Sequence, residues 1–249
     1  MNTIAIFGAG PGLGLALARR FGREGYRVAL VGRTPATLDR LTATLAEEGV
    51  EAARFVADLR DLDQVDAALA DIRARFGSID VVEYAPITTE GFVPAADLDV
   101  AGLQHHTDLL LRTPVHLVQR VLPDMVAAGD GAILVTHGGT AVSPAPGLSG
   151  LGPAMAATRN YLHSLHGEVA GKGVYVGTLV VNAMIIGSAA HQQLDADAGT
   201  GFELPDGVEL PSVTPEELAE TYWQMLRDRD RVEAARPEGF SFADAFATA

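Results

Sequence analysis

Three glycines near the N-terminus, Gly8, Gly12 and Gly14, have the spacing of a turn that can hold the diphosphate of a dinucleotide. They lie in the segment FGAGPGLG, between an apolar run and the first helical pattern. The first glycine permits a tight turn, the second lets a diphosphate approach the backbone, and the third lets the helix pack closely on the strand. A plain Gly-Pro turn is the alternative. The motif predicts a cofactor seat formed by Gly8, Gly10, Pro11, Gly12, Leu13 and Gly14.

Arg33 and Thr34 follow the second apolar run, in the segment LVGRTP. Dinucleotide-binding folds that prefer NAD commonly carry an acidic residue there, which binds the ribose hydroxyls of the adenosine. A guanidinium instead suits a 2′-phosphate, because it can form charge-assisted and bidentate hydrogen bonds. We predict that Arg33 and Thr34 bind the cofactor and that NADP(H) is preferred over NAD(H). A solvated arginine at a helix start is the alternative.

Short apolar runs alternate with amphipathic stretches along the chain, and these elements must position the cofactor seat. Strands are predicted for TIAIFG, RVALVG, ARFVAD, DVVEYA, GAILVTH and VYVGTLVVN. Helices are predicted over 14–23, 36–48, 62–76, 100–127, 152–170 and 214–226, the last of them capped by Thr214. This pattern is typical of a parallel sheet covered by helices. We predict an α/β fold, a Rossmann-type doubly wound parallel sheet in a single domain spanning residues 1–249.

The least regular segment, 188–213, is rich in glycine, aspartate and glutamine and follows the sixth predicted strand. Open α/β sheets commonly carry a substrate-covering loop at this point. We predict such a loop, and a solvated loop without a function is the alternative.

Composition excludes several classes of partner. The chain has 18 basic and 32 acidic residues and a net charge of −14, which argues against nucleic acid because phosphate backbones require basic surfaces. It has no cysteine, and no His, Asp or Glu spacing suggests a metal site. No apolar run reaches the roughly 18 residues of a membrane span, and the N-terminus lacks the pattern of a signal peptide. We predict a cytoplasmic protein that acts on a small molecule away from membranes.

Several of these segments together resemble the short-chain dehydrogenase/reductase (SDR) family over roughly residues 3–187. The resemblance rests on the glycine turn, on the Asp58-Leu59 pair after the third strand, on VLPDM and on GAILVTHGG. It implies that Asp58 and Leu59 lie against the adenine of the cofactor. It also implies that Ala85 and Pro86 contact the cofactor, although the family's Asn-Asn-Ala-Gly motif reads EYAP here.

The residues that carry the family's chemistry are replaced in this sequence. The family uses an asparagine, a serine, a tyrosine and a lysine, and their positions correspond by spacing to Leu110, Gly138, Leu151 and Met155. Removing a positioned general acid typically costs roughly 10²–10⁴ in rate, so carbonyl reduction by the family's usual route is not expected. The resemblance places a pocket for an apolar substrate at Leu110, Gly138, Leu151, Met155 and Asn182, the last in place of a family glycine.

Three polar residues could take over the missing chemistry. His137 ends the fifth strand beside Gly138, and imidazole titrates near neutrality, although strand alternation can turn it away from the site. Thr140 could donate a hydrogen bond, and Tyr84 could reach the cofactor with its phenol. A structural histidine and an aromatic side chain packed on the cofactor are the alternatives for His137 and Tyr84.

Three functions remain open at this stage. The preferred one is an atypical NADP(H)-dependent oxidoreductase that acts without the usual tyrosine and lysine. The others are a non-redox enzyme of the same fold, such as a cyclase, isomerase or dehydratase, and an NADP(H)-binding regulatory protein without turnover. The family resemblance further implies a homodimer or homotetramer through its fourth and fifth helices, whose apolar stripes could equally be ordinary core.

Overall fold

The computed structural model describes residues 1–86, 93–189, 191–192 and 211–241. In this part of the chain, seven parallel strands form one sheet in the order β3-β2-β1-β4-β5-β6-β9. This confirms the predicted doubly wound parallel sheet. The strands are β1 (Thr3–Phe7), β2 (Arg27–Gly32), β3 (Ala52–Val56), β4 (Val81–Tyr84), β5 (Gly131–Gly138), β6 (Val174–Val181) and β9 (Glu233–Arg236).

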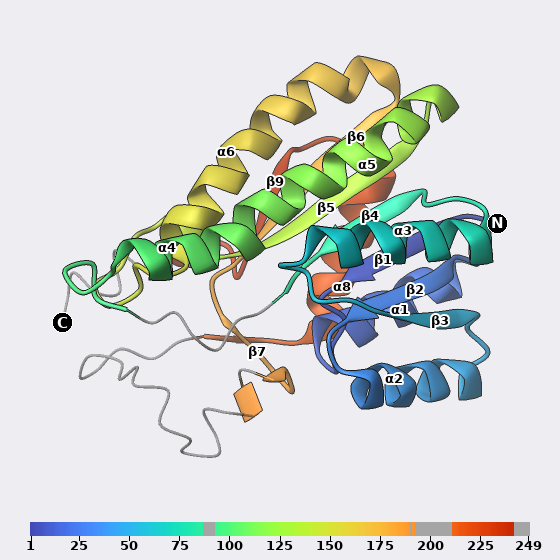
Figure 1. Cartoon of the computed structure of the whole chain (residues 1–249), viewed down its shortest axis with the longest axis horizontal. Coiled ribbons are helices and arrows are strands. Elements are labelled where there is room, and N and C mark those ends of the chain that lie inside the picture. Colours follow the sequence, from blue (N-terminus) through green and yellow to red (C-terminus); the bar gives the residue numbers. More distant parts are fainter. Residues whose placement is uncertain (87–92, 190, 193–210, 242–249) are drawn as a thin grey trace.

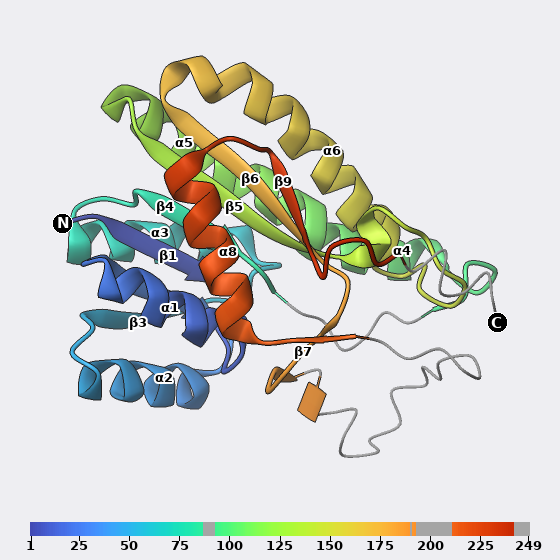
Figure 2. The same ribbon diagram turned by 180° about the vertical axis from the view of Figure 1, so that it is seen from behind.

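Helices cover both faces of the sheet (Figures 1 and 2). One face carries α1 (Leu13–Arg23), α2 (Pro35–Glu47) and α8 (Pro215–Asp228). The other carries α3 (Leu62–Phe76), α5 (Thr113–Ala128) and α6 (Gly152–Val169), and α4 (Val100–Thr107) precedes α5. Thr214 caps α8 as predicted, because its hydroxyl accepts the N–H of Glu217 at 3.2 Å.

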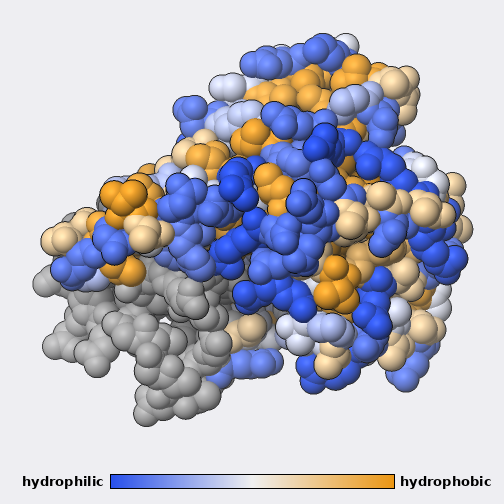
Figure 3. Space-filling model, viewed as in Figure 1, coloured by the Kyte–Doolittle hydropathy of each residue, from blue (hydrophilic) through white to orange (hydrophobic). Residues whose placement is uncertain are grey.

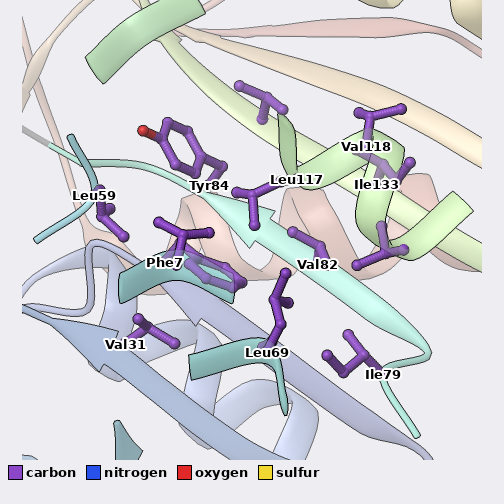
Figure 4. Packing of buried hydrophobic residues seen from close by; sticks show 14 of the residues in the cluster. Phe7, Val31, Leu59, Leu69, Ile79, Val82, Tyr84, Leu117, Val118 and Ile133 are labelled. Carbon is purple, nitrogen blue, oxygen red and sulfur yellow. The ribbon is translucent and has the colours of Figure 1, made fainter. Parts of the chain in front are cut away.

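Each face of the sheet has its own hydrophobic core, because successive strand residues point to opposite sides. On β5, Ile133 and Val135 join the core under α3, α5 and α6, whereas Leu134 joins the core under α1, α2 and α8. Figure 4 shows the first of these cores, with Phe7, Val82 and Ile133 packed together.

The strand order reverses between β1 and β4, which lie side by side in the middle of the sheet. The connections that leave these two strands run to opposite sides, so the carboxyl ends of β1 and β4 border a crevice in folds of this type. The glycine turn follows β1, and Ala85 and Pro86 follow β4. The fold therefore brings two of the predicted cofactor segments to the same edge.

The helix predicted over 100–127 is interrupted. The chain forms α4, then a π-helical turn η1 (Asp108–Arg112), and then α5. A π-helical turn inserts one residue into the helical repeat, so it leaves carbonyl groups without their usual backbone partners. Periodicity predicted one helix because the apolar positions of LLLRTPVHL continue across the turn.

The structure adds three strands that the sequence did not predict. β9 extends the main sheet beside β6, and two short strands, β7 (Met184–Ile185) and β8 (Ser212–Val213), pair with each other. The predicted substrate-covering loop, 188–213, lies for the most part outside the described residues. β7 lies just before this segment and pairs with β8, which is at the C-terminal end of the segment.

The apolar stripes of α5 and α6 face the interior of the chain. Leu117, Val118 and Val121 on α5 and Leu162 and Leu165 on α6 are buried. Figure 3 shows mainly polar side chains over α3 and α5 on the surface of this side of the molecule. These buried members of the stripes belong to the core of one chain, and an interface between chains through α5 and α6 stays a prediction.

Candidate functional site

The glycine turn lies directly against the end of β4. Gly8 has a φ of 91°, a left-handed conformation that favours glycine. A Cβ added to Gly8 would lie 2.6 Å from the Cα of Pro86, and the N–H of Ala85 donates to the carbonyl of Phe7 at 3.0 Å. No larger residue fits at position 8 without displacing the backbone of Ala85 and Pro86.

The first turn of α1 presents a helix N-terminus without an acidic or capping side chain. Gly12 is the N-cap and makes no side-chain cap bond, and the first turn of α1 contains no acidic residue. A helix N-terminus with free N–H groups favours an anion. A Cβ on Gly12 would lie 3.2 Å from Ser188, so the segment after β6 closes over the same turn. The turn therefore has the chemistry that a diphosphate requires.

Arg33 and Thr34 are both exposed at the start of α2. Thr34 is the N-cap of α2, its hydroxyl makes no cap bond, and the first turn of α2 has no acidic residue. Arg33 forms no ion pair with any residue that the structure describes, unlike Arg19, which pairs with Glu48 at 2.6 Å. A cation, a hydroxyl and a helix N-terminus thus lie together, and no carboxylate of the described residues pairs with the cation.

Asp58 and Leu59 follow β3 and are tied to the protein by local hydrogen bonds. Asp58 accepts the N–H of Arg60 on Oδ1, at 3.0 Å, and its own N–H donates to Gln64 Oε1. The carbonyl of Leu59, which is buried, accepts the hydroxyl of Thr113 at 2.5 Å. These bonds fix the backbone of the pair, and its contact with adenine stays a prediction.

The four positions that the sequence resemblance predicts for the family's catalytic residues carry apolar side chains or, at Gly138, no side chain. Met155, on α6, is buried, and its Sδ accepts the N–H of Gly138 at 3.3 Å. Leu110, in the π-helical turn, belongs to the same hydrophobic core as Met155. Half-buried Leu151, at the start of α6, packs against that core. None of these side chains can donate a proton.

Hydroxyl groups from β4 and α6 satisfy two carbonyl groups of the π-helical turn. Tyr84 donates its phenol to the carbonyl of Leu109 at 2.5 Å, and Thr158 on α6 donates to the carbonyl of Leu110. Figure 4 shows the Tyr84 ring beside the core, with its oxygen directed away from the aliphatic side chains. Burial raises the pKa of Tyr84 well above its usual range. The phenol is thus engaged with the backbone.

His137 points into the core on the α6 side of the sheet. It is 2% exposed, and its Nε2 has no hydrogen-bond partner among the described residues. Burial lowers the pKa of His137 to about 4, an effect that Glu233 opposes and that Arg159 and His163 reinforce. The imidazole is therefore neutral at pH 7. A neutral imidazole can accept a proton or share one in a hydrogen bond, but it holds no extra proton to give.

Thr140 and Asn182 border the same region from the ends of β5 and β6. Thr140 lies in a short 3-10 turn, η2 (Gly139–Ala141), and its carbonyl oxygen is 3.3 Å from the position of a Cβ on Gly152. Asn182 is buried, and its N–H donates to the carbonyl of Arg236 on β9 at 2.7 Å. The structure thus places Thr140 at the start of α6 and anchors Asn182 to the edge strand.

Two features near the site were missed by sequence reasoning. The hydroxyl of Thr158 is one of them, and no local motif indicates its partner. The other is Glu83, which is fully buried in β4 and hydrogen bonds to Thr136. A glutamate inside the apolar run DVVEYA was the available signal, because a buried carboxyl group needs a partner or must be neutral.

The fold and the glycine turn define a dinucleotide-binding protein of the doubly wound class. Residues 2–198 match the family model of the short chain dehydrogenases. The chain is 32% identical over 183 residues to an oxidoreductase of Sarocladium schorii. The matched region covers 72% of this chain and 70% of the relative. The chain therefore belongs to the short-chain dehydrogenase/reductase family.

Other relatives agree with this assignment over more of the chain. An NADP-dependent 3-hydroxy acid dehydrogenase of Salmonella typhi is 27% identical over 224 residues, covering 88% of this chain and 87% of the relative. The structure of an actinorhodin polyketide ketoreductase with NADPH superposes with a TM-score of 0.85 at 21% identity, covering 98% of this chain and 97% of that one. The chain is thus related to oxidoreductases, which confirms the predicted enzyme class.

Neither a metal cluster nor a membrane-spanning helix is found among the described residues. No group of three or more His, Cys, Asp or Glu side chains in these residues is arranged to hold a metal ion. Among the same residues, no helix combines the length and the apolar character that a membrane crossing demands.

Proposed function

We propose that this protein is an NADP(H)-dependent oxidoreductase that acts on an apolar small molecule without the tyrosine and lysine of its family. The observation that carries the proposal is the combination of an anion seat at the glycine turn with apolar residues at Leu110, Gly138, Leu151 and Met155. The seat suits a dinucleotide, and the apolar positions suit a substrate that is not held by charge.

The choice of NADP(H) over NAD(H) is supported by Arg33 and Thr34. A guanidinium that forms no ion pair with a described residue can bind a 2′-phosphate at low cost, because no such ion pair must be broken. The relative from Salmonella typhi is NADP-dependent, and the polyketide ketoreductase was solved with NADPH. The diphosphate would lie at residues 8–14, beside Ala85 and Pro86.

Bound NADP(H) would supply or accept hydride, and the protein's own contribution would be to bind, orient and exclude water. Met155 and Leu151 would form an apolar wall, and the Met155 sulfur would hold the backbone at Gly138. The proton that accompanies hydride transfer would come from water or from the substrate. His137 and Thr140 remain the candidates for a protein hydrogen bond, whereas the bond from Tyr84 to Leu109 favours a structural role for that phenol.

One observation favours a second candidate function. The Tyr84 hydroxyl donates its hydrogen bond to the backbone carbonyl of Leu109, and burial keeps the His137 imidazole neutral. A protein that binds NADP(H) and responds to it without turnover would need no proton donor. This alternative predicts cofactor binding with no consumption of NADPH.

Titration calorimetry with NADPH and NADH, followed by NADPH oxidation against a panel of apolar carbonyl and conjugated compounds, tests the proposal. We expect NADPH to bind more tightly than NADH and at least one apolar compound to be reduced. Binding without reduction of any compound would favour the regulatory alternative. Conversion of a compound without a change in cofactor absorbance would favour a non-redox enzyme. A lack of binding of either nucleotide would refute the proposal.

A further inference from the structure

Glu83 is a carboxylic acid in the centre of the sheet. It lies on β4 between Ile6 of β1 and Leu134 of β5, and its side chain is completely buried. It faces the core that α1 and α8 cover, because its neighbours in that face, Ile6 and Leu134, belong to that core. A charged group at this position would be strongly disfavoured.

The carboxyl group of Glu83 has a short chain of partners. Its Oε1 accepts the hydroxyl of Thr136 on β5 at 2.9 Å, and the Thr136 oxygen lies 2.8 Å from the hydroxyl of Tyr222 on α8. Its Oε2 is buried and has no partner among the described residues. The chain Glu83–Thr136–Tyr222 therefore joins two central strands to a helix.

No cation of the described residues compensates a negative charge at Glu83. Burial raises the pKa of Glu83 to about 8, and only the hydrogen bond from Thr136 opposes this rise. Among the described residues, the other fully buried titratable groups of this core are the phenols of Tyr222 and Tyr175, whose own pKa values burial raises, and the partly buried Tyr26 packs at its edge. The carboxyl group is thus protonated at neutral pH.

The charged residues of the covering helices lie at the surface. On α1, Arg20 pairs with Glu24 and with Glu220 of α8. On the opposite face of the sheet, His137 of β5 points away from Glu83. β1 contributes apolar residues to this face. None of these groups can neutralise Glu83 without a rearrangement of the core.

Glu83 lies on β4 two residues before the segment that contacts the glycine turn. Two residues further along the chain, the N–H of Ala85 donates to the carbonyl of Phe7, and Pro86 lies against Gly8 so closely that a Cβ there would be 2.6 Å away. A shift of the end of β4 must therefore move the glycine turn. Close-packed cores transmit such shifts because they contain little free volume.

We propose that Glu83 is a positioning residue for the dinucleotide seat, and that it holds Pro86 against Gly8 only while its carboxyl group is protonated. When the proton is lost to water, the charge draws solvent toward the chain of Glu83, Thr136 and Tyr222, and the end of β4 loosens. Dinucleotide binding then weakens. The identity of the ligand rests on the proposed function, whereas the behaviour of the carboxyl group and the turn does not.

The first test is NADPH affinity between pH 6 and pH 9 in the wild type and in Glu83→Gln. If only the protonated form binds, the apparent Kd of the wild type rises about tenfold between pH 7 and pH 9. The Glu83→Gln variant keeps a neutral side chain, so its Kd should stay constant within about twofold. Glu48→Gln removes a surface ion pair with Arg19 and serves as the control, with the wild-type pH dependence expected. An equal pH dependence in Glu83→Gln would overturn the proposal.

A second readout does not require a nucleotide. The infrared band of a protonated carboxyl group should be present at pH 7, fade as the pH rises through 8, and be missing in Glu83→Gln. Amide exchange of residues 8–14, corrected for intrinsic rates, should accelerate over the same pH range in the wild type only. If NADPH does not bind at any pH, the proposed function fails, and these two measurements still decide the role of Glu83.

Thr136→Val provides a further variant in case Glu83→Gln does not fold. It removes the one hydrogen bond that favours the charged form of Glu83. We expect the loss of the carboxyl band to move to higher pH, together with the onset of faster exchange in residues 8–14. An unchanged midpoint for both signals would contradict the proposed coupling.

Discussion

In the proposed function, Arg33 selects NADP(H) over NAD(H), because it is the cation at the end of β2 and has no ion-pair partner among the described residues. We expect Arg33→Ala to weaken NADPH binding roughly tenfold or more, since a hydrogen bond to a charged group contributes about 1.5–3 kcal/mol. NADH lacks the 2′-phosphate, so its affinity should change little. Titration calorimetry with both nucleotides measures the two effects. Equal losses for NADPH and NADH would remove the cofactor assignment.

A matched control for Arg33 is available on α1. Arg23 is exposed in the last turn of that helix, away from the glycine turn at its start. Arg23→Ala removes the same positive charge from the protein. It should leave both affinities unchanged, which separates a local contact from the effect of net charge.

His137 makes stability depend on pH on the acidic side. Burial lowers the pKa of His137 to about 4 in the folded state, against an ordinary value of 6.5. Between these values the unfolded chain binds more protons, so stability is full above pH 6.5 and is lost as the pH falls toward 4. The slope from this group is at most about 1.4 kcal/mol per pH unit.

Urea denaturation of the wild type and of His137→Leu at pH 7 and pH 5 measures this effect. The variant has no imidazole to protonate, so the stability of the wild type relative to the variant should fall on acidification. The same difference at both pH values would show that His137 is not held neutral by burial.

The π-helical turn interrupts a helix that the sequence predicted as continuous. The Thr158 hydroxyl stabilises this turn by donating a hydrogen bond to the carbonyl of Leu110. Thr158→Val keeps the shape of the side chain but leaves the buried carbonyl of Leu110 without that hydroxyl, which costs about 1–3 kcal/mol. Chemical denaturation measures the loss, and Thr158→Ser should recover most of it. We also expect the variant to perturb the region of Leu110 and Met155 rather than the whole protein.

Thr42 on α2 provides the matched control. Its hydroxyl also donates to a carbonyl, that of Leu38 at 2.8 Å, four residues earlier in the same helix. Thr42→Val should change stability by only about 0.5 kcal/mol, because helical carbonyls keep their backbone bonds. If both valine variants cost the same, the special role of Thr158 is wrong.

At the scale of the whole molecule, the family leads us to expect a homodimer or homotetramer through α5 and α6. The exposed side of α6 carries small and polar residues, Ala157 and Asn160 among them. Small residues allow two helices to approach closely, so Ala157→Arg should reduce the assembly to smaller species in light scattering. Ala43→Arg, on the exposed side of α2, introduces the same charge elsewhere and should leave the mass unchanged. A wild-type monomer would contradict the expected assembly.

The acidic net charge is also a property of the whole molecule. A value of −14 repels an anionic cofactor at long range. The local groups at α1, α2 and Arg33 must therefore outweigh it at the seat, and added salt should weaken the repulsion by screening. This is why the position of a few groups decides cofactor binding in an acidic protein.

The sequence by itself determined the order along the chain of the predicted strands and helices and the place of the glycine turn between β1 and α1. The alternation of apolar runs and amphipathic stretches predicted the doubly wound sheet, because the spacing of apolar residues indicates which face each strand or helix buries. The glycine turn was predictable because its residues are consecutive and need no contact with a distant segment, and its role as a cofactor seat stays a prediction. The sequence did not predict the π-helical turn within 100–127 or the edge strand β9. Both depend on contacts with other elements, which periodicity along the chain does not reveal.

The tertiary structure alone decided the state of the polar side chains. Tyr84 finds its acceptor 25 residues away at Leu109, and Thr158 finds Leu110 at a separation of 48. Thr136 meets Tyr222 across 86 residues and thereby completes the chain that ends at Glu83. Burial and hydrogen bonding set whether these groups are charged, neutral or free to react, and both arise only when distant segments pack together.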